Sequence, residues 1–180
     1  MNATTTRRVL LEAAEIERTI ARLAHQIVEP HACVDELVMM GVRRGGEALA
    51  RRIADCIGRI AGTTPALGFL NIDLYRDDEV SHDLPESLIP VDVAGKTVVV
   101  VDDVLYTGRT VRSALDAVTD LGRPAVIRLC VLVDRGLREL PVQGDFVGRF
   151  VPTSRRERIV VNIAPVPSQS DEVVLFADPA

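Results

Sequence analysis

Three observations predict an α/β fold for this chain: a mostly parallel sheet flanked by helices, with an antiparallel hairpin at its C-terminal end. Short apolar runs rich in β-branched residues alternate with longer segments of helical periodicity. Several of these runs end in acidic residues or in a glycine-containing segment, after which a helical pattern begins. The length of 180 residues is most simply a single domain over residues 1–180, large enough to bury a core.

The elements follow in order along the chain. Ile16, Ile20, Leu23, Ala24 and Ile27 mark one face of an amphipathic helix over residues 12–28. A short buried strand over 36–40 precedes a helix that holds the apolar residues of 48–57. A strand is expected over 64–75, followed by a long polar connection over 76–96. Strands over 125–133, 158–163 and 172–176 complete the sheet and the closing hairpin.

Composition limits the possible functions. The net charge is −5 and there is no Trp, so the core depends on Val, Leu, Ile and Ala. The three cysteines are widely spaced without a C-x-x-C pair, which argues against a disulfide framework or a zinc site and favours reduced packing residues. No apolar stretch approaches the length of a membrane span. These features predict a cytoplasmic protein without a membrane partner.

The central stretch is VVVVDDVLYTGRT, from Val98 to Thr110. Four valines predict a strand buried on both faces, which we expect to end at Asp102 and Asp103. The residues after Thr110 have helical periodicity up to Gly122. The unpaired N–H groups at the start of this helix, with the hydroxyls of Thr107 and Thr110, would bind a phosphate group.

The two acids suit the vicinal hydroxyls of a sugar, or a hydrated cation. Asp102, Asp103 and the loop together therefore favour a ribose 5-phosphate site. The alternative is that the acids only end a strand and the loop only caps a helix, which is common for either feature alone. A nucleoside triphosphate P-loop is excluded, because no G-x-x-x-x-G-K-[ST] occurs and Lys96 is the only lysine.

Two further strand ends belong to the same edge of the predicted sheet. The loop Gly41–Gly46 carries Arg43 and Arg44 before a helix, and such guanidinium groups could hold a diphosphate. An Arg-Gly turn without a ligand is the alternative. The strand over 125–133 ends in Asp134, Arg135 and Gly136. Ligands gather at the carboxyl ends of the strands in open α/β sheets, so this end faces the same crevice.

The central stretch resembles the 5-phosphoribosyl diphosphate signature of type I phosphoribosyltransferases. The longer spelling DDVLYTGRTVR narrows the resemblance, together with LYRDD at 74–78, LGRP at 121–124, VLVDRG at 131–136, RELP at 138–141 and VPTSR at 151–155. Over nearly the whole chain, the combination is similar to the family of pyrimidine operon attenuation proteins with uracil phosphoribosyltransferase activity (PyrR). In place of the Thr-Arg-Gly of that family, this sequence has Arg44-Gly45-Gly46.

The resemblance implies a type I phosphoribosyltransferase-like fold and a role for each part of the site. It implies that the 76–96 connection is a hood loop over the bound substrate, and that Mg²⁺ comes with the substrate and has no direct protein ligand. The implied residues are Asp102, Asp103 and Arg76 as catalytic; Arg43, Arg44, Gly45, Asp102, Asp103, Val104, Leu105, Tyr106, Thr107, Gly108, Arg109 and Thr110 for 5-phosphoribosyl diphosphate; and Val133, Asp134 and Arg135 for the base.

RNA binding is the second property that the resemblance implies. The corresponding residues are Arg22, His25, Arg138 and Arg149. Residues 128–158 hold seven arginines against four acids, which favours a basic patch for a polyanion or, equally, an ordinary solvated region.

The resemblance implies an enzyme that joins uracil to 5-phosphoribosyl diphosphate, giving UMP and diphosphate, although the residues alone do not distinguish uracil from another base. It also implies a UMP-responsive regulator that binds the leader of a pyrimidine mRNA. The alternatives are a non-catalytic, nucleotide-sensing RNA-binding attenuator and a purine phosphoribosyltransferase. The resemblance further implies a homodimer or a higher homo-oligomer.

Overall fold

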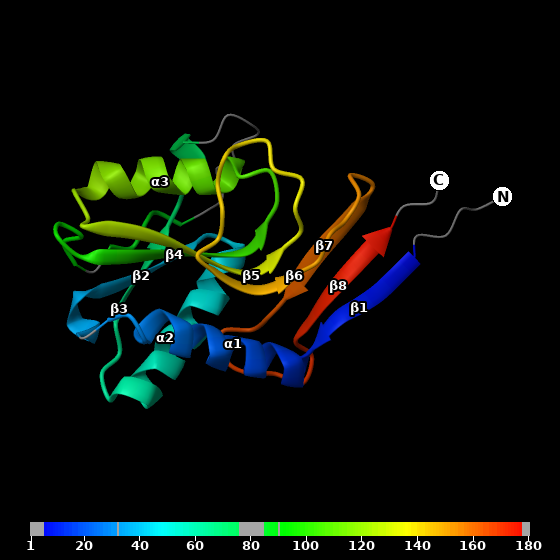
Figure 1. Ribbon diagram of the computed structural model, residues 1–180, viewed down its shortest axis with the longest axis horizontal. Coiled ribbons are helices and arrows are strands. Elements are labelled where there is room, and N and C mark those ends of the chain that lie inside the picture. Colours follow the sequence, from blue (N-terminus) through cyan, green and yellow to red (C-terminus); the bar gives the residue numbers. More distant parts are fainter. Residues whose placement is uncertain (1–5, 32, 76–84, 90, 178–180) are drawn as a thin grey trace.

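The computed structural model describes residues 6–31, 33–75, 85–89 and 91–177. Its centre is a five-stranded parallel sheet in the order β3-β2-β4-β5-β6. The strands of this sheet are β2 (Leu37–Val42), β3 (Ala66–Leu70), β4 (Thr97–Leu105), β5 (Val126–Asp134) and β6 (Phe146–Phe150). Helices α1 (Ala13–Val28) and α2 (Gly45–Ala61) cover one face of the sheet, and α3 (Arg109–Leu121) covers the other (Figure 1).

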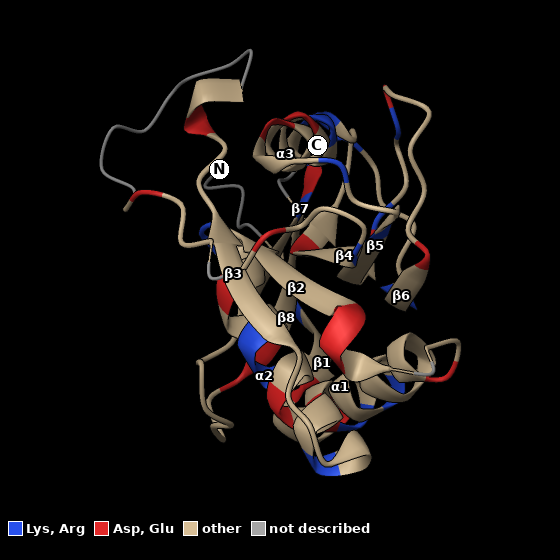
Figure 2. Ribbon diagram, turned by 90° about the vertical axis from the view of Figure 1, so that its left-hand side faces the viewer, with Lys and Arg blue, Asp and Glu red and all other residues tan. Residues whose placement is uncertain are grey.

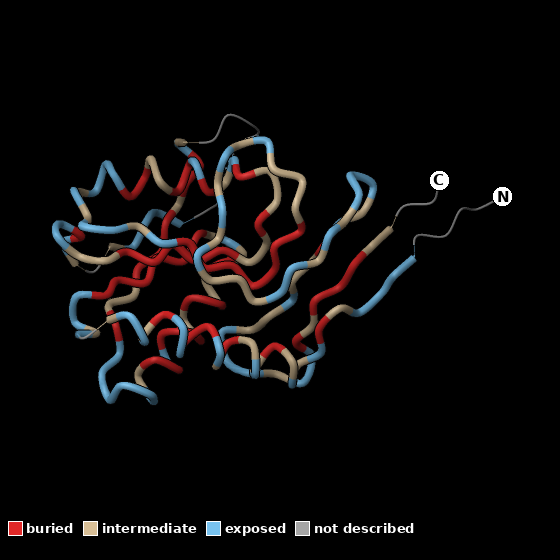
Figure 3. Tube along the Cα trace, viewed as in Figure 1, coloured by how far each residue is buried: buried red, intermediate tan, exposed pale blue. Residues whose placement is uncertain are grey.

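The alternation of side chains along the strands explains this layering. Met39, Val99 and Val101 belong to the core that α1 and α2 cover. Their neighbours Met40, Val98 and Val100 belong to the core beneath α3. Since successive side chains of a strand point to opposite faces, four consecutive valines bury both faces of β4. Figure 3 shows the resulting band of buried residues through the centre of the sheet.

A second sheet of three antiparallel strands, in the order β1-β8-β7, extends from the main body (Figure 1). Its strands are β1 (Thr6–Glu12), β7 (Glu157–Asn162) and β8 (Glu172–Ala177). The predicted closing hairpin is therefore present, with Val160 opposite Val174. The sequence analysis did not predict β1, which pairs with β8 from Thr6 opposite Ala177 onward.

Two sequence expectations about individual elements were wrong. The strand predicted over 64–75 ends at Leu70, and a short 3-10 turn follows at Asp73–Tyr75. Another 3-10 turn, at Val34–Glu36, comes directly before β2. Strand β4 does not stop at Asp102 and Asp103 but pairs with β5 as far as Leu105, opposite Asp134. Asp102 and Asp103 keep the extended backbone because pairing with β5 continues beyond them.

The cysteines fit the expectation in two of three cases, since Cys56 and Cys130 are buried and Cys33 is exposed. Burial raises the pKa of the Cys130 thiol to about 12, so this thiol stays protonated. No helix in the described part of the chain is long and apolar enough to cross a membrane.

Candidate active site

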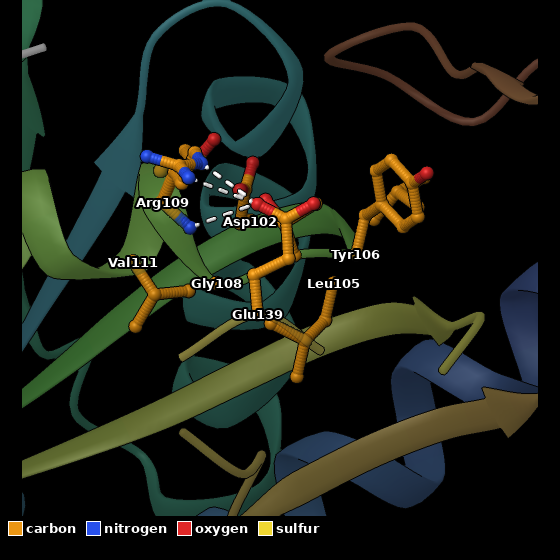
Figure 4. A pocket seen from close by; sticks show the side chains of 10 residues that line it. Asp102, Leu105, Tyr106, Gly108, Arg109, Val111 and Glu139 are labelled. Carbon is orange, nitrogen blue, oxygen red and sulfur yellow. Dashed lines mark hydrogen bonds and ion pairs between the residues drawn. The ribbon is translucent and has the colours of Figure 1, made fainter. Parts of the chain in front are cut away.

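A cavity of about 360 Å³ opens where β4 ends and α3 begins. Its walls come almost entirely from the central stretch of the sequence (Figure 4). The lining residues are Asp102, Val104, Leu105, Tyr106, Thr107, Gly108, Arg109, Thr110, Val111 and Glu139. The structure thus brings one predicted ribose-binding acid and all the predicted phosphate-binding residues to one hollow.

The loop at the floor of this cavity requires a glycine. Gly108 has φ +95°, and a β carbon there would collide with the side chain of Val142. Gly108 is also the N-cap residue of α3, and no side chain caps this helix. The first N–H groups of a helix lack intrahelical partners and carry its positive partial charge, so the end of α3 is suited to a phosphate group.

Asp102 and Asp103 face different surroundings. Asp102 lines the cavity, and its Oδ1 accepts a hydrogen bond of 2.9 Å from the backbone N–H of Asp103. The Asp103 carboxylate accepts a hydrogen bond of 2.8 Å from the backbone N–H of Val104. It lies against Gly45 at the start of α2. Burial raises the pKa of the Asp103 carboxyl above its ordinary value. Asp103 therefore connects the predicted ribose site to the predicted diphosphate loop.

That diphosphate loop is shorter than predicted, because β2 continues to Val42 and α2 begins at Gly45. Only Arg43 and Arg44 remain between them, joined by a cis peptide. The Arg43 guanidinium lies 3.4 Å from a Glu47 oxygen and over the ring of Phe69. Its buried Nε has no hydrogen-bond partner in the described structure. None of Arg43, Arg44 and Gly45 lines the cavity itself.

Glu139 is a wall residue to which the sequence analysis gave no role in the site. Its Oε2 accepts a hydrogen bond of 3.0 Å from Arg109 Nε, and Figure 4 shows the two side chains pointing toward each other. Arg155 lies 3.8 Å from its other oxygen. The backbone N–H of Glu139 also donates to the Thr107 carbonyl, at 2.9 Å. Glu139 is part of the motif RELP. Its contact with Arg109 could not be predicted from a local pattern, because the two residues are thirty positions apart in the sequence.

The predicted base-reading residues lie at the end of β5, beside the cavity. Val133 is fully buried, and Asp134 and Arg135 are 8% and 6% exposed. The Arg135 guanidinium stacks over the Tyr106 ring at 4.2 Å and donates to Thr153 Oγ1 at 2.8 Å. The Arg135 main-chain N–H donates to the Leu105 carbonyl at 3.0 Å. The side chains of Asp134 and Arg135 thus have partners within the protein.

The predicted catalytic Arg76 lies outside the described residues, as do residues 77–84 and 90 of the predicted hood. Described residues on either side of 76–84 make contacts with the rest of the fold. Tyr75 Oη donates a hydrogen bond of 2.8 Å to Asp120 on α3, and this bond is the main cause of the raised pKa of Tyr75. On the far side, Leu88 pairs with Phe69 through two backbone hydrogen bonds.

The predicted RNA-binding residues separate into two places. Arg22 on α1 donates to the carbonyls of Val147 and Gly148 in β6, while Arg149 donates to the Leu10 carbonyl at 2.8 Å. His25 is exposed on α1. Figure 2 shows basic segments in α1 and beside β6, two elements in contact. Arg138 lies apart from these three, next to the cavity.

A metal ion finds few candidate protein ligands. Among the described residues, no three His, Cys, Asp or Glu side chains are grouped so that they could hold a metal ion. The carboxylates of Asp102 and Asp103 are oxygen donors of the kind that a hydrated Mg²⁺ contacts through its waters. The donor set therefore fits an Mg²⁺ ion that arrives with a phosphorylated substrate.

Comparison with known proteins gives a consistent result. The family model described as phosphoribosyl transferase domain matches residues 8–169. A protein of Roseiflexus sp. named bifunctional protein PyrR is 50% identical over 173 residues, which cover 92% of this chain and 93% of that protein. The proteins of the same name from Chloroflexus aurantiacus and Bacillus mycoides are 49% and 48% identical, with 92% and 93% of this chain covered and 93% and 96% of theirs.

Solved structures resemble the fold. The hypoxanthine phosphoribosyltransferase of Trypanosoma cruzi superposes with a TM-score of 0.71 at 18% identity, with 96% of this chain and 97% of that chain covered. A hypoxanthine-guanine phosphoribosyltransferase of Bacillus anthracis gives a TM-score of 0.69 at 19% identity, with full coverage of both chains. At such identities the likeness concerns the arrangement of helices and strands.

Proposed function

Because this chain belongs to the phosphoribosyltransferase family and, within it, to the PyrR proteins, we propose that it joins uracil to 5-phosphoribosyl diphosphate in the cavity at the end of β4. The products are UMP and diphosphate. The observation that carries this proposal is the combination of a carboxylate from β4 with a glycine-containing loop at the N-terminus of α3, around one cavity of about 360 Å³.

The 5′-phosphate binds in the loop from Leu105 to Thr110. Its oxygens accept hydrogen bonds from the N–H groups at the start of α3 and from the hydroxyls of Thr107 and Thr110. Arg109, which pairs with Glu139, adds a cation at the same end of the cavity. Asp102 and Asp103 hold the ribose hydroxyls and so fix the sugar for attack at C1.

The diphosphate leaves toward the β2–α2 loop. Arg43 and Arg44 stabilise the negative charge that develops on the leaving oxygen, and Arg76 does so from the hood. Arg44 substitutes for the arginine that the family has at Gly45. The contact between Gly45 and Asp103 supports this placement, because it sets the loop directly beside the ribose-binding acids.

The chemistry is a displacement at C1 of the ribose. N1 of uracil forms the new bond and loses its proton, while the bond from C1 to the diphosphate oxygen breaks and that oxygen keeps the electron pair. The carboxylates of Asp102 and Asp103 would hold Mg²⁺ through its waters, and the ion would neutralise part of the diphosphate charge. The protein supplies position and electrostatic stabilisation, and the hood excludes water so that transfer is faster than hydrolysis.

The base is read at the end of β5, by Val133, Asp134 and Arg135. Val133 lies opposite Val104, and Asp134 lies opposite Leu105, so this edge is adjacent to the phosphate loop. Uracil requires a donor for each carbonyl and an acceptor for its ring N–H.

The test is UMP formation from uracil and 5-phosphoribosyl diphosphate with Mg²⁺, with guanine and hypoxanthine as controls. Turnover with uracil alone is the expected result. Turnover with a purine base would identify a purine phosphoribosyltransferase instead. Absence of turnover with every base, while UMP still binds, would identify a nucleotide sensor without transferase activity.

We also propose that the chain binds the leader of a pyrimidine mRNA and senses UMP through the same cavity. The supporting observation is the proximity of α1 and β6, which carry Arg22, His25 and Arg149. A ligand that binds the RNA-competent state more tightly shifts the population toward that state. RNA affinity measured with and without UMP over a salt series tests this proposal. Affinity that does not respond to UMP would refute it.

The family membership supports two further proposals. The chain works in the cytoplasm on soluble substrates, and it assembles into a homodimer or a higher homo-oligomer. Light scattering after size-exclusion chromatography measures the oligomeric state, and a monomer at micromolar concentration would contradict the second proposal.

A further inference from the structure

Glu139 places a negative charge at the phosphate end of the cavity. It lies in the connection between β5 and β6, the yellow loop of Figure 1, and lines the cavity from outside the central stretch. Asp102, the other acid among the described lining residues, has a proposed partner in the ribose. A carboxylate beside a phosphate site is unfavourable, because both groups are negatively charged. The proposed reaction gives Glu139 no role.

The main chain holds Glu139 beside the phosphate loop, which runs from Leu105 to Thr110. The backbone N–H of Glu139 donates to the Thr107 carbonyl at 2.9 Å, and that of Leu140 donates to the same carbonyl at 3.1 Å. These two hydrogen bonds join the β5–β6 connection to the loop. The Glu139 side chain therefore starts next to the phosphate loop whichever rotamer it adopts.

The Glu139 carboxylate lies between two arginines. Its Oε2 is 3.0 Å from both Nε and Nη2 of Arg109, so one oxygen faces two nitrogens of the same guanidinium. Its Oε1 is 3.8 Å from Nη1 of Arg155. Figure 4 shows the side chains of Arg109 and Glu139 pointing toward each other. The carboxylate thus occupies N–H groups of Arg109 that an incoming phosphate could also use.

These ion pairs are weak enough to exchange. The side chains of Arg109, Glu139 and Arg155 are 54%, 33% and 71% exposed, and ion pairs with this exposure contribute little to stability. A phosphate monoester carries a charge of about −1.5 to −2 near neutral pH and has three strong acceptor oxygens, so it is the stronger partner for a guanidinium. Arg155 stays near the carboxylate when Arg109 turns to the phosphate, and each charge keeps a partner.

We propose that Glu139 is an internal anion that competes with the 5′-phosphate for the guanidinium of Arg109. UMP or 5-phosphoribosyl diphosphate replaces the carboxylate at Arg109, and the loss of this ion pair lowers the affinity for the nucleotide. The inference rests on the proposed function, since it concerns the phosphate end of that same site. Glu139 thereby sets how readily the product UMP leaves and which UMP concentration the protein senses.

The test compares Glu139→Gln, Arg109→Gln and the double variant. Glutamine keeps the size of the glutamate side chain and one acceptor oxygen but removes the charge. Asp116→Asn is the matched control, because Asp116 also pairs with an arginine of α3, Arg112 at 3.4 Å, and does not line the cavity. Calorimetry measures the Kd of UMP, of ribose 5-phosphate, which lacks the base, and of uridine, which lacks the phosphate.

Glu139→Gln is expected to tighten the binding of UMP and ribose 5-phosphate about fivefold, because the phosphate no longer displaces an ion pair. Uridine affinity should change less than about twofold, since uridine has no group for Arg109. In uracil turnover, the inhibition constant of UMP should also fall about fivefold in this variant. Asp116→Asn should behave as the wild type.

The double variant tests the competition itself. Arg109→Gln should weaken UMP about 10-fold, because a charge-assisted contact is lost. Adding Glu139→Gln to Arg109→Gln should change the Kd of UMP less than about twofold, since the guanidinium for which the two anions compete is gone. Equal tightening with and without Arg109 would overturn the proposal, because the carboxylate would then repel the phosphate directly.

Two other results would also overturn it. Weaker UMP binding in Glu139→Gln would show that Glu139 anchors Arg109 for the phosphate. Unchanged dissociation constants with a smaller active fraction would show a purely structural role. Wild-type protein that binds UMP without turning over uracil would contradict the transferase proposal only, and protein that binds ribose 5-phosphate but not UMP would contradict the choice of base. In both cases the ribose 5-phosphate affinities still decide the role of Glu139.

Discussion

The β4–α3 loop and the β2–α2 loop both join a parallel strand to a helix N-terminus, and β2 and β4 are neighbours in the sheet. In the β4–α3 loop, residues from Leu105 to Thr110 line an open cavity. Next to the β2–α2 loop, Gly45 and Gly46 in the first turn of α2 are packed directly against Asp103 and the Val101 carbonyl. A strand that leads into a helix thus gives a cavity wall in one place and a packed contact in the other.

The largest effect should come from the two acids that lie between these loops. We expect Asp102→Asn and Asp103→Asn each to lower kcat/KM for uracil by about 100-fold, because charge-assisted hydrogen bonds to the ribose hydroxyls are lost. Steady-state kinetics with Asp116→Asn, on an exposed part of α3, provides the control. Turnover within threefold of wild type would remove the acids from the mechanism.

A substitution at each of the two glycines that begin α2 separates the effect on packing from the effect on activity. Gly46→Ala places a β carbon against the Val101 carbonyl, which cannot move without shifting β4, and should lower the free energy of unfolding by about 2 kcal/mol. Gly45→Ala meets the Asp103 side chain, which can turn away. We expect this variant to lose more activity than stability.

Urea denaturation and uracil turnover measure the two effects. Gly62→Ala, where nothing lies within 4 Å and only φ +75° is unfavourable, should cost about 1 kcal/mol and serves as the reference. Equal stability losses in Gly45→Ala and Gly46→Ala would show that Asp103 is held as rigidly as the main chain.

Ligand affinity can distinguish the loops, since UMP has a 5′-phosphate but no diphosphate. Thr110→Val in the β4–α3 loop should weaken UMP and 5-phosphoribosyl diphosphate alike, by about 10-fold. Arg44→Gln in the β2–α2 loop should weaken 5-phosphoribosyl diphosphate by about 10-fold and change UMP affinity less than twofold. Calorimetric titrations would measure the affinities for UMP and for 5-phosphoribosyl diphosphate. Weaker UMP binding in Arg44→Gln would contradict the assignment of the 5′-phosphate to one loop and the diphosphate to the other.

The smallest effect concerns the ionisation of Asp103. Burial raises the pKa of this carboxyl above its ordinary value. The folded state then binds the proton more tightly than the unfolded state, so the stability that this group contributes is complete below its ordinary pKa and is lost as pH rises through the raised one. Because asparagine does not ionise, Asp103→Asn should gain stability relative to wild type between pH 3 and pH 7.

Thermal unfolding over that pH range measures the difference. A relative loss of stability for Asp103→Asn toward pH 7 would mean that the Asp103 carboxylate has a favourable partner near Gly45.

The parts of the fold that the sequence predicted correctly depend on local periodicity. All five apolar residues assigned to the buried face of α1 are buried, because a period of 3.6 residues needs no distant partner to be recognised. Strand β1 was missed since its sequence TRRVLLE is charged and mostly exposed. It is a strand because of its pairing with β8, which no local pattern reveals.

The candidate site divides in the same way. The residues from Leu105 to Thr110 line one cavity because they are adjacent in sequence. The contacts of Glu139 with Arg109, and of Arg138 with Tyr106, depend on how the β5–β6 connection returns to the phosphate loop. Sequence patterns could not predict these contacts, because the returning segment has no regular secondary structure.

The pairing of β1 with β8 also has a consequence for the order of folding. Thr6 meets Ala177, so the three-stranded sheet requires one of the longest loop closures in the chain. The five parallel strands are all present by Phe150, and can associate during synthesis before β8 exists. The nascent chain therefore carries β1 as an unpaired strand until β8 is available, and the charges in its sequence TRRVLLE protect it from pairing with other chains.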